Sequence, residues 1–188
     1  AIQGLTIIGE SINDSVPSTN ALYEAEDFAG IQELARSQEA GGAAFIDVNV
    51  GTRSPEFMTR VSEAVVAATA VPTSIDSPDY ALAEAGLRVC DPNRGKPILN
   101  SISPLRLEMF DLLKIMPFRP ILLLTEHIGA DGNGAPSKTA EETYSAAEFL
   151  FNEAKKRGIP NEDIIFDPGV APLGADTEGD LVRLLETL

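Results

Sequence analysis

The chain has 188 residues and a formal net charge of −15, with 44% hydrophobic and 23% charged residues. This composition predicts one globular domain over residues 1–188 rather than a disordered chain. The negative charge argues against binding to nucleic acid or to an anionic membrane, because both attract Lys and Arg. Cys90 is the single cysteine, which excludes an intrachain disulfide and favours a reduced, cytoplasmic setting. No apolar run approaches the roughly 20 residues of a membrane span, and no signal peptide is visible.

Short apolar runs alternate with helical patterns along the whole chain. Strands are expected at residues 5–9, 43–50, 72–76, 97–100, 120–125 and 163–167. Helices are expected at about residues 24–40, 54–70, 77–86, from 103, at 139–157, and from 176 or 177 to the end. Residues 14–20 and the Gly-rich stretch 126–138 are expected to be loops.

Several helix starts carry capping signals. Ser54, Ser77 and Ser103 each precede a proline, which is typical of an N-cap followed by Pro at the first helical position. Thr139 and Glu142 have the spacing of a capping box. Because Ser77 is expected to cap the helix that follows, Asp76 is left available for another role.

The alternation of strands and helices predicts an α/β fold with a parallel sheet and right-handed crossovers. Two architectures fit: an open doubly wound sheet, or a TIM (β/α)8 barrel of which about six of the eight strand–helix units are present. No Gly-x-Gly-x-x-Gly follows the first strand, which weakens the dinucleotide-binding version of the open sheet.

Polar side chains gather where the expected strands end. In either architecture ligands bind at the carboxyl ends of the strands. The residues expected there are Glu10, Asn13, Asp47, Asn49, Asp76, Asn100, Ser101, Glu126 and Asp167. Carboxylates and amides with almost no cation suit a neutral heterocycle rich in hydrogen-bond donors, such as a pterin, whose 2-amino group and ring N–H can both donate to one carboxylate.

Structural roles compete with this interpretation at several positions. Asn13 and Asp167 could serve turns, and Asp47 and Asn49 could bond loop backbone. His127 is the only histidine, so a metal site is not expected. Asp131 and Asn133 lack the later ligands of a calcium loop and are expected to lie in a flexible loop.

Five motifs resemble those of one family in the same order. They are Ile7-Ile-Gly-Glu-Ser-Ile-Asn13, Asp47-Val-Asn-Val-Gly51, Ser74-Ile-Asp-Ser77, Ile98-Leu-Asn-Ser-Ile-Ser103 and Asp167-Pro168. The chain resembles, over its whole length, the pterin-dependent methyltetrahydrofolate:corrinoid methyltransferases, including the folate domain of cobalamin-dependent methionine synthase. The familiar Arg of the first motif is Ser11 here.

The resemblance implies a TIM barrel, usually a homodimer, in which Asp76, Asn100 and Asp167 hold the pterin ring. Glu10, Asn13, Asp47, Asn49 and Ser101 are expected at the pocket rim. It also implies methyl transfer between N5 of tetrahydrofolate and the cobalt of a corrinoid (cobalamin) on a partner protein, with hydrogen bonding or protonation activating N5. The family's N5-contacting Asn lies on a seventh strand, expected beyond Leu188, so the chain is expected to be part of a longer protein.

Two other functions stay open at this point. One is a dihydropteroate synthase-like enzyme, although Gly9 to Asn13 does not match the first-strand segment of that family and few basic residues are available for its pyrophosphate substrate. The other is a non-catalytic pterin-binding domain of a larger assembly.

Overall fold

The computed structural model describes residues 4–170 and 180–187 and divides into two compact units. The first comprises Ala1–Asn100 with Leu112–Arg119, and the second Ser101–Asp111 with Pro120–Leu188. The cap expected at Asp176 or Thr177 lies outside the described residues.

The first unit contains a parallel sheet whose strands follow the order of the chain. They are β1 (Ile8–Gly9), β2 (Phe45–Val48), β3 (Thr73–Asp76) and β4 (Ile98–Ile102), the last of which runs past the boundary at Asn100. The register pairs Asp47 with Ser74 and Asp76 with Asn100. Neighbouring parallel strands therefore bring their polar carboxyl ends to one edge of the sheet.

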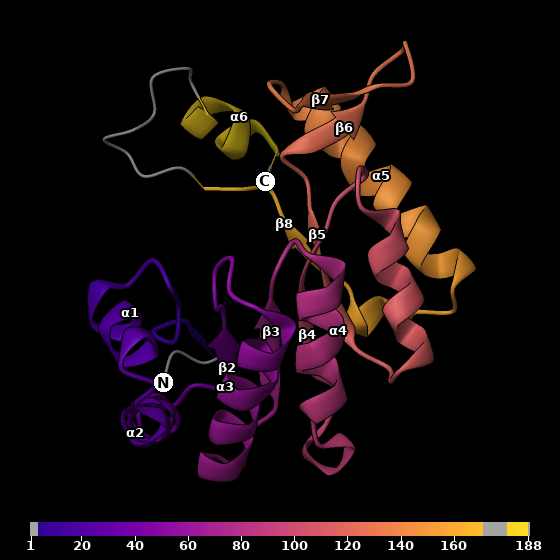
Figure 1. Cartoon of the computed structure of the whole chain (residues 1–188). Coiled ribbons are helices and arrows are strands. Elements are labelled where there is room, and N and C mark those ends of the chain that lie inside the picture. Colours follow the sequence, from indigo (N-terminus) through magenta and orange to yellow (C-terminus); the bar gives the residue numbers. More distant parts are fainter. Residues whose placement is uncertain (1–3, 171–179, 188) are drawn as a thin grey trace. The chain divides into compact units, whose positions relative to one another are not determined.

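Four α-helices belong to this unit: α1 (Pro17–Glu24), α2 (Phe28–Ala40), α3 (Pro55–Ala68) and α4 (Tyr80–Val89), followed by the 3-10 turn η1 (Pro92–Arg94). The helix α3 packs against both α2 and α4, beside β2 and β3 (Figure 1). Ile46 on β2 and Ile75 on β3 are fully buried, as are Val61 and Val65 on α3. Apolar side chains of strand and helix thus form the core that holds the strand ends in place.

The second unit joins β5 (Arg119–Leu123) to β8 (Ile165–Asp167) in parallel. An antiparallel hairpin, β6 (Glu126–Ile128) and β7 (Gly134–Pro136), follows β5. Its other elements are α5 (Ala140–Lys156), η3 (Asn161–Asp163) and α6 (Asp180–Thr187). The long 3-10 segment η2 (Leu107–Lys114) begins in this unit and ends in the first.

Three expected segments differ from the structure. The helix expected at 24–40 is α2, which begins only at Phe28 because Asp27 caps it by accepting from Gly30 N. A separate helix, α1, occupies Pro17–Glu24, so the loop expected at 14–20 is wrong from residue 17 on. The Gly-rich stretch 126–138 is the β6–β7 hairpin rather than a loop. The helix expected from residue 103 is replaced by the 3-10 segment η2, which begins at Leu107.

The expected caps are confirmed at Ser54 and Thr139 and wrong at Ser77 and Ser103. No α-helix begins directly after Ser103, whose Oγ accepts from Leu105 N ahead of η2. Ser54 accepts from Phe57 N, and Thr139 with Glu142 forms a complete capping box. At α4 the N-cap is Asp79, whose carboxylate accepts from Leu82 N, while Ser77 accepts from Asp79 N instead. Asp76 is still not a cap, because Asp79 caps α4 in place of Ser77, and the Asp76 carboxylate stays available for another role.

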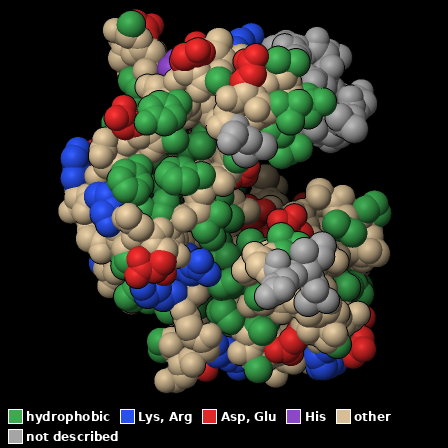
Figure 2. Space-filling model, turned by 180° about the vertical axis from the view of Figure 1, so that it is seen from behind, with side chains coloured by type: hydrophobic (Ala, Val, Ile, Leu, Met, Phe, Trp, Pro, Cys, Tyr) green, Lys and Arg blue, Asp and Glu red, His purple; other side chains and the backbone are tan. Residues whose placement is uncertain are grey.

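Hydrophobic side chains reach the surface along α6, where Leu181, Val182 and Leu185 are all exposed (Figure 2). Among the described residues, no helix combines the length and apolar character needed to cross a membrane.

Candidate functional site

Three carboxylates come together at the ends of β1, β2 and β3. Asp47 is 2% exposed, and Asp76, at the last position of β3, is half-buried. The negative charge of Glu10, which follows β1, acts on both aspartates. The adjacent strand ends therefore hold a close cluster of acids, as their positions in the sequence predict.

Burial and the neighbouring negative charges raise the pKa values of the two aspartates. Burial, followed by the charge of Asp76, raises the pKa of Asp47 well above its ordinary value, although a 2.6 Å hydrogen bond donated by Ser74 Oγ opposes the shift. Burial also raises the pKa of Asp76, against the lowering effect of its bond from Asn49. Asp47 is the more buried of the two, so it is the group in which this site best retains a proton.

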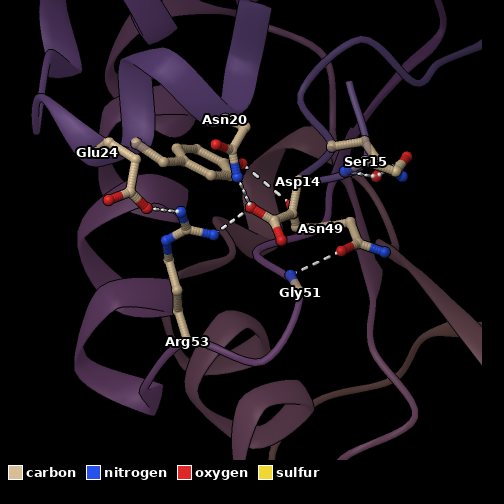
Figure 3. A network of polar contacts seen from close by, with 9 residues as sticks. Asp14, Ser15, Asn20, Glu24, Asn49, Gly51 and Arg53 are labelled. Atoms are coloured by element: carbon tan, nitrogen blue, oxygen red, sulfur yellow. Dashed lines mark hydrogen bonds and ion pairs between the residues drawn. The ribbon is translucent and has the colours of Figure 1, made fainter. Parts of the chain in front are cut away.

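Asn49 links the ends of β2 and β3. Its side-chain Nδ2 donates to Asp76 Oδ2 at 2.8 Å, and its Oδ1 accepts from Gly51 N at 2.8 Å. The bond to Gly51 fixes the orientation of the amide, because the same side chain must accept at one end and donate at the other (Figure 3). Asn49 therefore orients the Asp76 carboxylate rather than simply lining a rim.

Asn100 lies directly beside Asp76 in the register of β3 and β4. Its backbone oxygen accepts from Ser77 N at 2.9 Å, which ties the two strand ends together. Within the described part of the chain, neither Asp76 Oδ1 nor the Asn100 side-chain amide has a hydrogen-bond partner in the protein. One carboxylate oxygen and one amide are thus available side by side.

Asp167 and Ser101 belong to the second unit. Asp167 ends β8, and its Oδ1 accepts from Gly169 N at 2.8 Å, as the turn interpretation predicts. Arg183 on α6, itself 5% exposed, donates to the carbonyl oxygen of Pro168 at 2.9 Å and holds the same turn. The expectation that Asp167 joins Asp76 and Asn100 around one ligand stays a prediction, as does a rim role for Ser101.

Asn13 is engaged in a local turn. Its Oδ1 accepts from both the backbone N and the Oγ of Ser15, at 2.9 and 2.7 Å. It also forms an isolated parallel bridge with Asn49, so its backbone supports the site while its side-chain oxygen serves the turn.

His127 and Glu126 begin the β6–β7 hairpin. The Nε2 of His127 lies 4.0 Å from Glu142 Oε1. In the described ranges, no group of three or more His, Cys, Asp or Glu side chains is arranged to hold a metal ion.

The sequence interpretation overlooked Ser74, Tyr23 and Arg53. Ser74 donates to Asp47, and Tyr23 donates to the Asn49 carbonyl oxygen. Arg53 pairs with Asp14 and Glu24 (Figure 3). The alternation of β3 could have indicated Ser74, since Asp76 two positions later shares its face. Nothing in the local pattern of Arg53 indicates that it reaches Asp14 in the loop after β1 and Glu24 at the end of α1.

Comparison with known proteins defines the class. The family described as "Pterin binding enzyme" matches residues 12–188, so the chain belongs to that family. The fold agrees: solved structures of dihydropteroate synthase from Xanthomonas albilineans superpose with TM-scores of 0.56 and 0.59, at 23% and 22% identity, over 98% of this chain and 66–67% of theirs. The α/β fold expected as six units of a TIM barrel is confirmed.

A curated relative is more similar in sequence. The "Methylcorrinoid:tetrahydrofolate methyltransferase" of Eubacterium limosum is 30% identical over 186 residues. The match covers 94% of this chain and 65% of that protein. The family resemblance expected from the five sequence motifs is therefore confirmed.

Proposed function

We propose that this chain is the pterin-binding part of a methyltransferase that moves a methyl group between N5 of tetrahydrofolate and the cobalt of a corrinoid carried by a partner protein. The relative from Eubacterium limosum supports the reaction class. The observation that carries the proposal is the pairing of Asp76 with Asn100 at adjacent strand ends, with an available carboxylate oxygen and an available amide. Asp167 is proposed to complete the set.

The chemistry of the paired side chains fits a pterin. The ring presents parallel N–H donors that a carboxylate can accept, and a 4-oxo group to which an amide can donate. Asp76 is proposed to take the donor edge and Asn100 the oxo group. The rim acids Glu10 and Asp47 are then proposed to lie close to the ring, and the raised pKa of Asp47 makes it the better candidate for a proton or hydrogen-bond donor.

The charges near the site favour methyl transfer over the dihydropteroate synthase-like reaction. Arg53, in the loop after β2, already pairs with two carboxylates, Asp14 and Glu24. A guanidinium neutralised in this way is a poor receptor for a pyrophosphate group. The corrinoid partner, the homodimer and the cytoplasmic setting stay predictions.

The test uses the full-length protein with tetrahydrofolate and methylcobalamin under anaerobic conditions. Loss of the methylcobalamin absorbance together with formation of methyltetrahydrofolate is the expected result. Folate binding without any methyl exchange would support the non-catalytic alternative and reject the enzyme.

Binding is tested separately with Asp76→Asn. Loss of a charge-assisted acceptor should weaken tetrahydrofolate binding by about 10- to 100-fold. Asp79→Asn is the matched control, because Asp79 caps α4 three residues away and should change stability only. Equal affinity of the Asp76 variant and the wild type would reject the proposed pocket.

A further inference from the structure

Arg53 connects the loop after β2 to the loop after β1 and to the end of α1. Its guanidinium donates to Asp14 Oδ1, in the loop after β1, and to Glu24 at the end of α1. It also lies over the Tyr23 ring, with 5.0 Å between Cζ and the ring centroid, and 5.5 Å from the centroid of Phe57. The Arg53 side chain is only 20% exposed, so this pair is shielded from water far more than a typical surface ion pair.

Two of the residues that Arg53 contacts, Asp14 and Tyr23, both donate to one atom. Asp14 N and Tyr23 OH each donate to the carbonyl oxygen of Asn49, at 3.1 Å. Asn49 is the residue whose side chain donates to Asp76. A continuous set of contacts therefore leads from Arg53, through Asp14 and Tyr23, to the Asn49 backbone and on to the Asp76 carboxylate.

Local packing leaves this arrangement little freedom. Asn20 Nδ2 also donates to Asp14 Oδ1, at 2.9 Å, so the aspartate is held from two sides (Figure 3). Gly51 has φ +62, and a methyl group added there would strike the Asp14 carboxylate. The chain thus uses glycine at this position both for its backbone conformation and for the close approach of Asp14.

We propose that Arg53 is a positioning residue of the pterin site: by holding Asp14 and Tyr23 it fixes Asn49, and through Asn49 the orientation of the Asp76 carboxylate. The inference rests on the proposed function only for the effect on pterin binding. The effect on Asp76 itself can be measured without any ligand.

Arg60 supplies a matched control within the same unit. It pairs with Glu26 and lies over the Phe28 ring at 4.5 Å, so it has the same kinds of contact as Arg53. Its side chain is 46% exposed, and its guanidinium donates to Glu26 rather than to Asn49 or Asp76. Removing Arg60 costs one ion pair and one cation–π contact and removing Arg53 costs two of each, but of the two only Arg53 is connected to the site.

The experiment compares Arg53→Met, Arg53→Lys and Arg60→Met in the full-length protein. The first readout is the titration of the Asp76 carboxyl carbon by NMR without ligand. The hydrogen bond from Asn49 lowers the Asp76 pKa, so Arg53→Met should raise that pKa, Arg53→Lys should raise it less, and Arg60→Met should leave it unchanged. The second readout is tetrahydrofolate affinity, expected to fall about tenfold in Arg53→Met and not in Arg60→Met.

The two readouts separate the two proposals. If the wild type fails to bind tetrahydrofolate, the proposed function is rejected, while the Asp76 titration still decides the role of Arg53. An Asp76 titration that is the same in Arg53→Met and the wild type, or shifted equally by Arg60→Met, overturns the positioning role. If Arg53→Met does not fold, Arg53→Lys and Asp14→Asn provide the same comparison.

Discussion

The Asn49 side-chain amide donates a hydrogen bond to Asp76 Oδ2 at 2.8 Å, joining the ends of β2 and β3. The bond uses one of the two lone pairs of Oδ2 and leaves the other, together with Oδ1, to accept from a ligand. It also favours the ionised form of Asp76, which burial disfavours. A charged carboxylate of fixed orientation is the form that accepts two parallel N–H donors best.

Replacing Asn49 with Ala should therefore damage binding without removing any proposed ligand contact. The Asp76 pKa should rise, and tetrahydrofolate affinity should fall by about 10- to 150-fold, the range of one lost hydrogen bond to a charged group. Isothermal titration with the variant measures the affinity. Asn93→Ala is the control, since Asn93 donates to Asp91 in an exposed turn. Similar losses in both variants would contradict the role assigned to Asn49.

Asp47→Asn should change how stability depends on pH. The pKa of Asp47 is raised in the folded state, so the folded state binds its proton more tightly than the unfolded state. This contribution to stability is complete below the unfolded pKa near 3.8 and is lost as pH rises through the folded pKa. In that window the free energy of unfolding falls by up to about 1.4 kcal/mol per pH unit.

The asparagine variant mimics the neutral acid and should remove this fall in the free energy of unfolding. Its stability relative to the wild type should therefore increase as pH rises from 4 toward 8, by on the order of 1 kcal/mol. Urea unfolding at several pH values measures the difference. Asp91→Asn is the control of opposite sign, because hydrogen bonds from Asn93 hold the pKa of Asp91 below its ordinary value. A stability difference between Asp47→Asn and the wild type that does not vary with pH would refute the buried-acid argument.

The strands and their polar ends could be predicted from sequence because both are local signals. Apolar runs that end on Asp47 and Asp76 are readable along the chain, and parallel pairing then brings the ends together. The helix α1 was missed because its N-cap is Val16, which offers no side-chain oxygen, and its start looks like a polar loop.

The contacts that orient the site could not be predicted, since they depend on tertiary packing. Asn49 and Asp76 are 27 residues apart, and Arg53 and Asp14 are 39 apart, yet each pair is in direct contact. Sequence identifies which side chains end the strands. Only the packing of α1 and α3 around the loops decides that Arg53 is used by neighbouring acids and is not left for a ligand.

Arg183→Met should loosen the turn that carries Asp167. The guanidinium donates to Pro168 O, Gly169 O and Thr143 Oγ1, so its removal takes a donor away from one buried and two half-buried acceptors. The free energy of unfolding should fall by about 2–3 kcal/mol, and hydrogen exchange at Gly169 N, which donates to Asp167, should become faster.

The control for this prediction is Arg88→Met, which removes only an exposed pair with Glu84 and should cost no more than about 0.5 kcal/mol. Unchanged exchange at Gly169 in Arg183→Met would show that the turn holds itself.

Cys90 should resist alkylation in the folded protein. Burial raises the pKa of its thiol from 9.0 to about 11, despite the contact of its Sγ with Thr73 Oγ1 at 3.0 Å. At pH 8 roughly one thiol in a thousand is then ionised, compared with about one in ten at the ordinary pKa, and the thiolate is the reactive form. Iodoacetamide should therefore label the native protein about 100-fold more slowly than the urea-unfolded chain, as followed by mass spectrometry.

The variant Thr73→Val tests the part played by ionisation. Valine has the shape of threonine without its hydroxyl, so it should preserve β3, remove the hydrogen bond that lowers the Cys90 pKa, and slow labelling further. Faster labelling of Thr73→Val at unchanged stability would show that access to the sulfur, rather than its ionisation, limits the reaction.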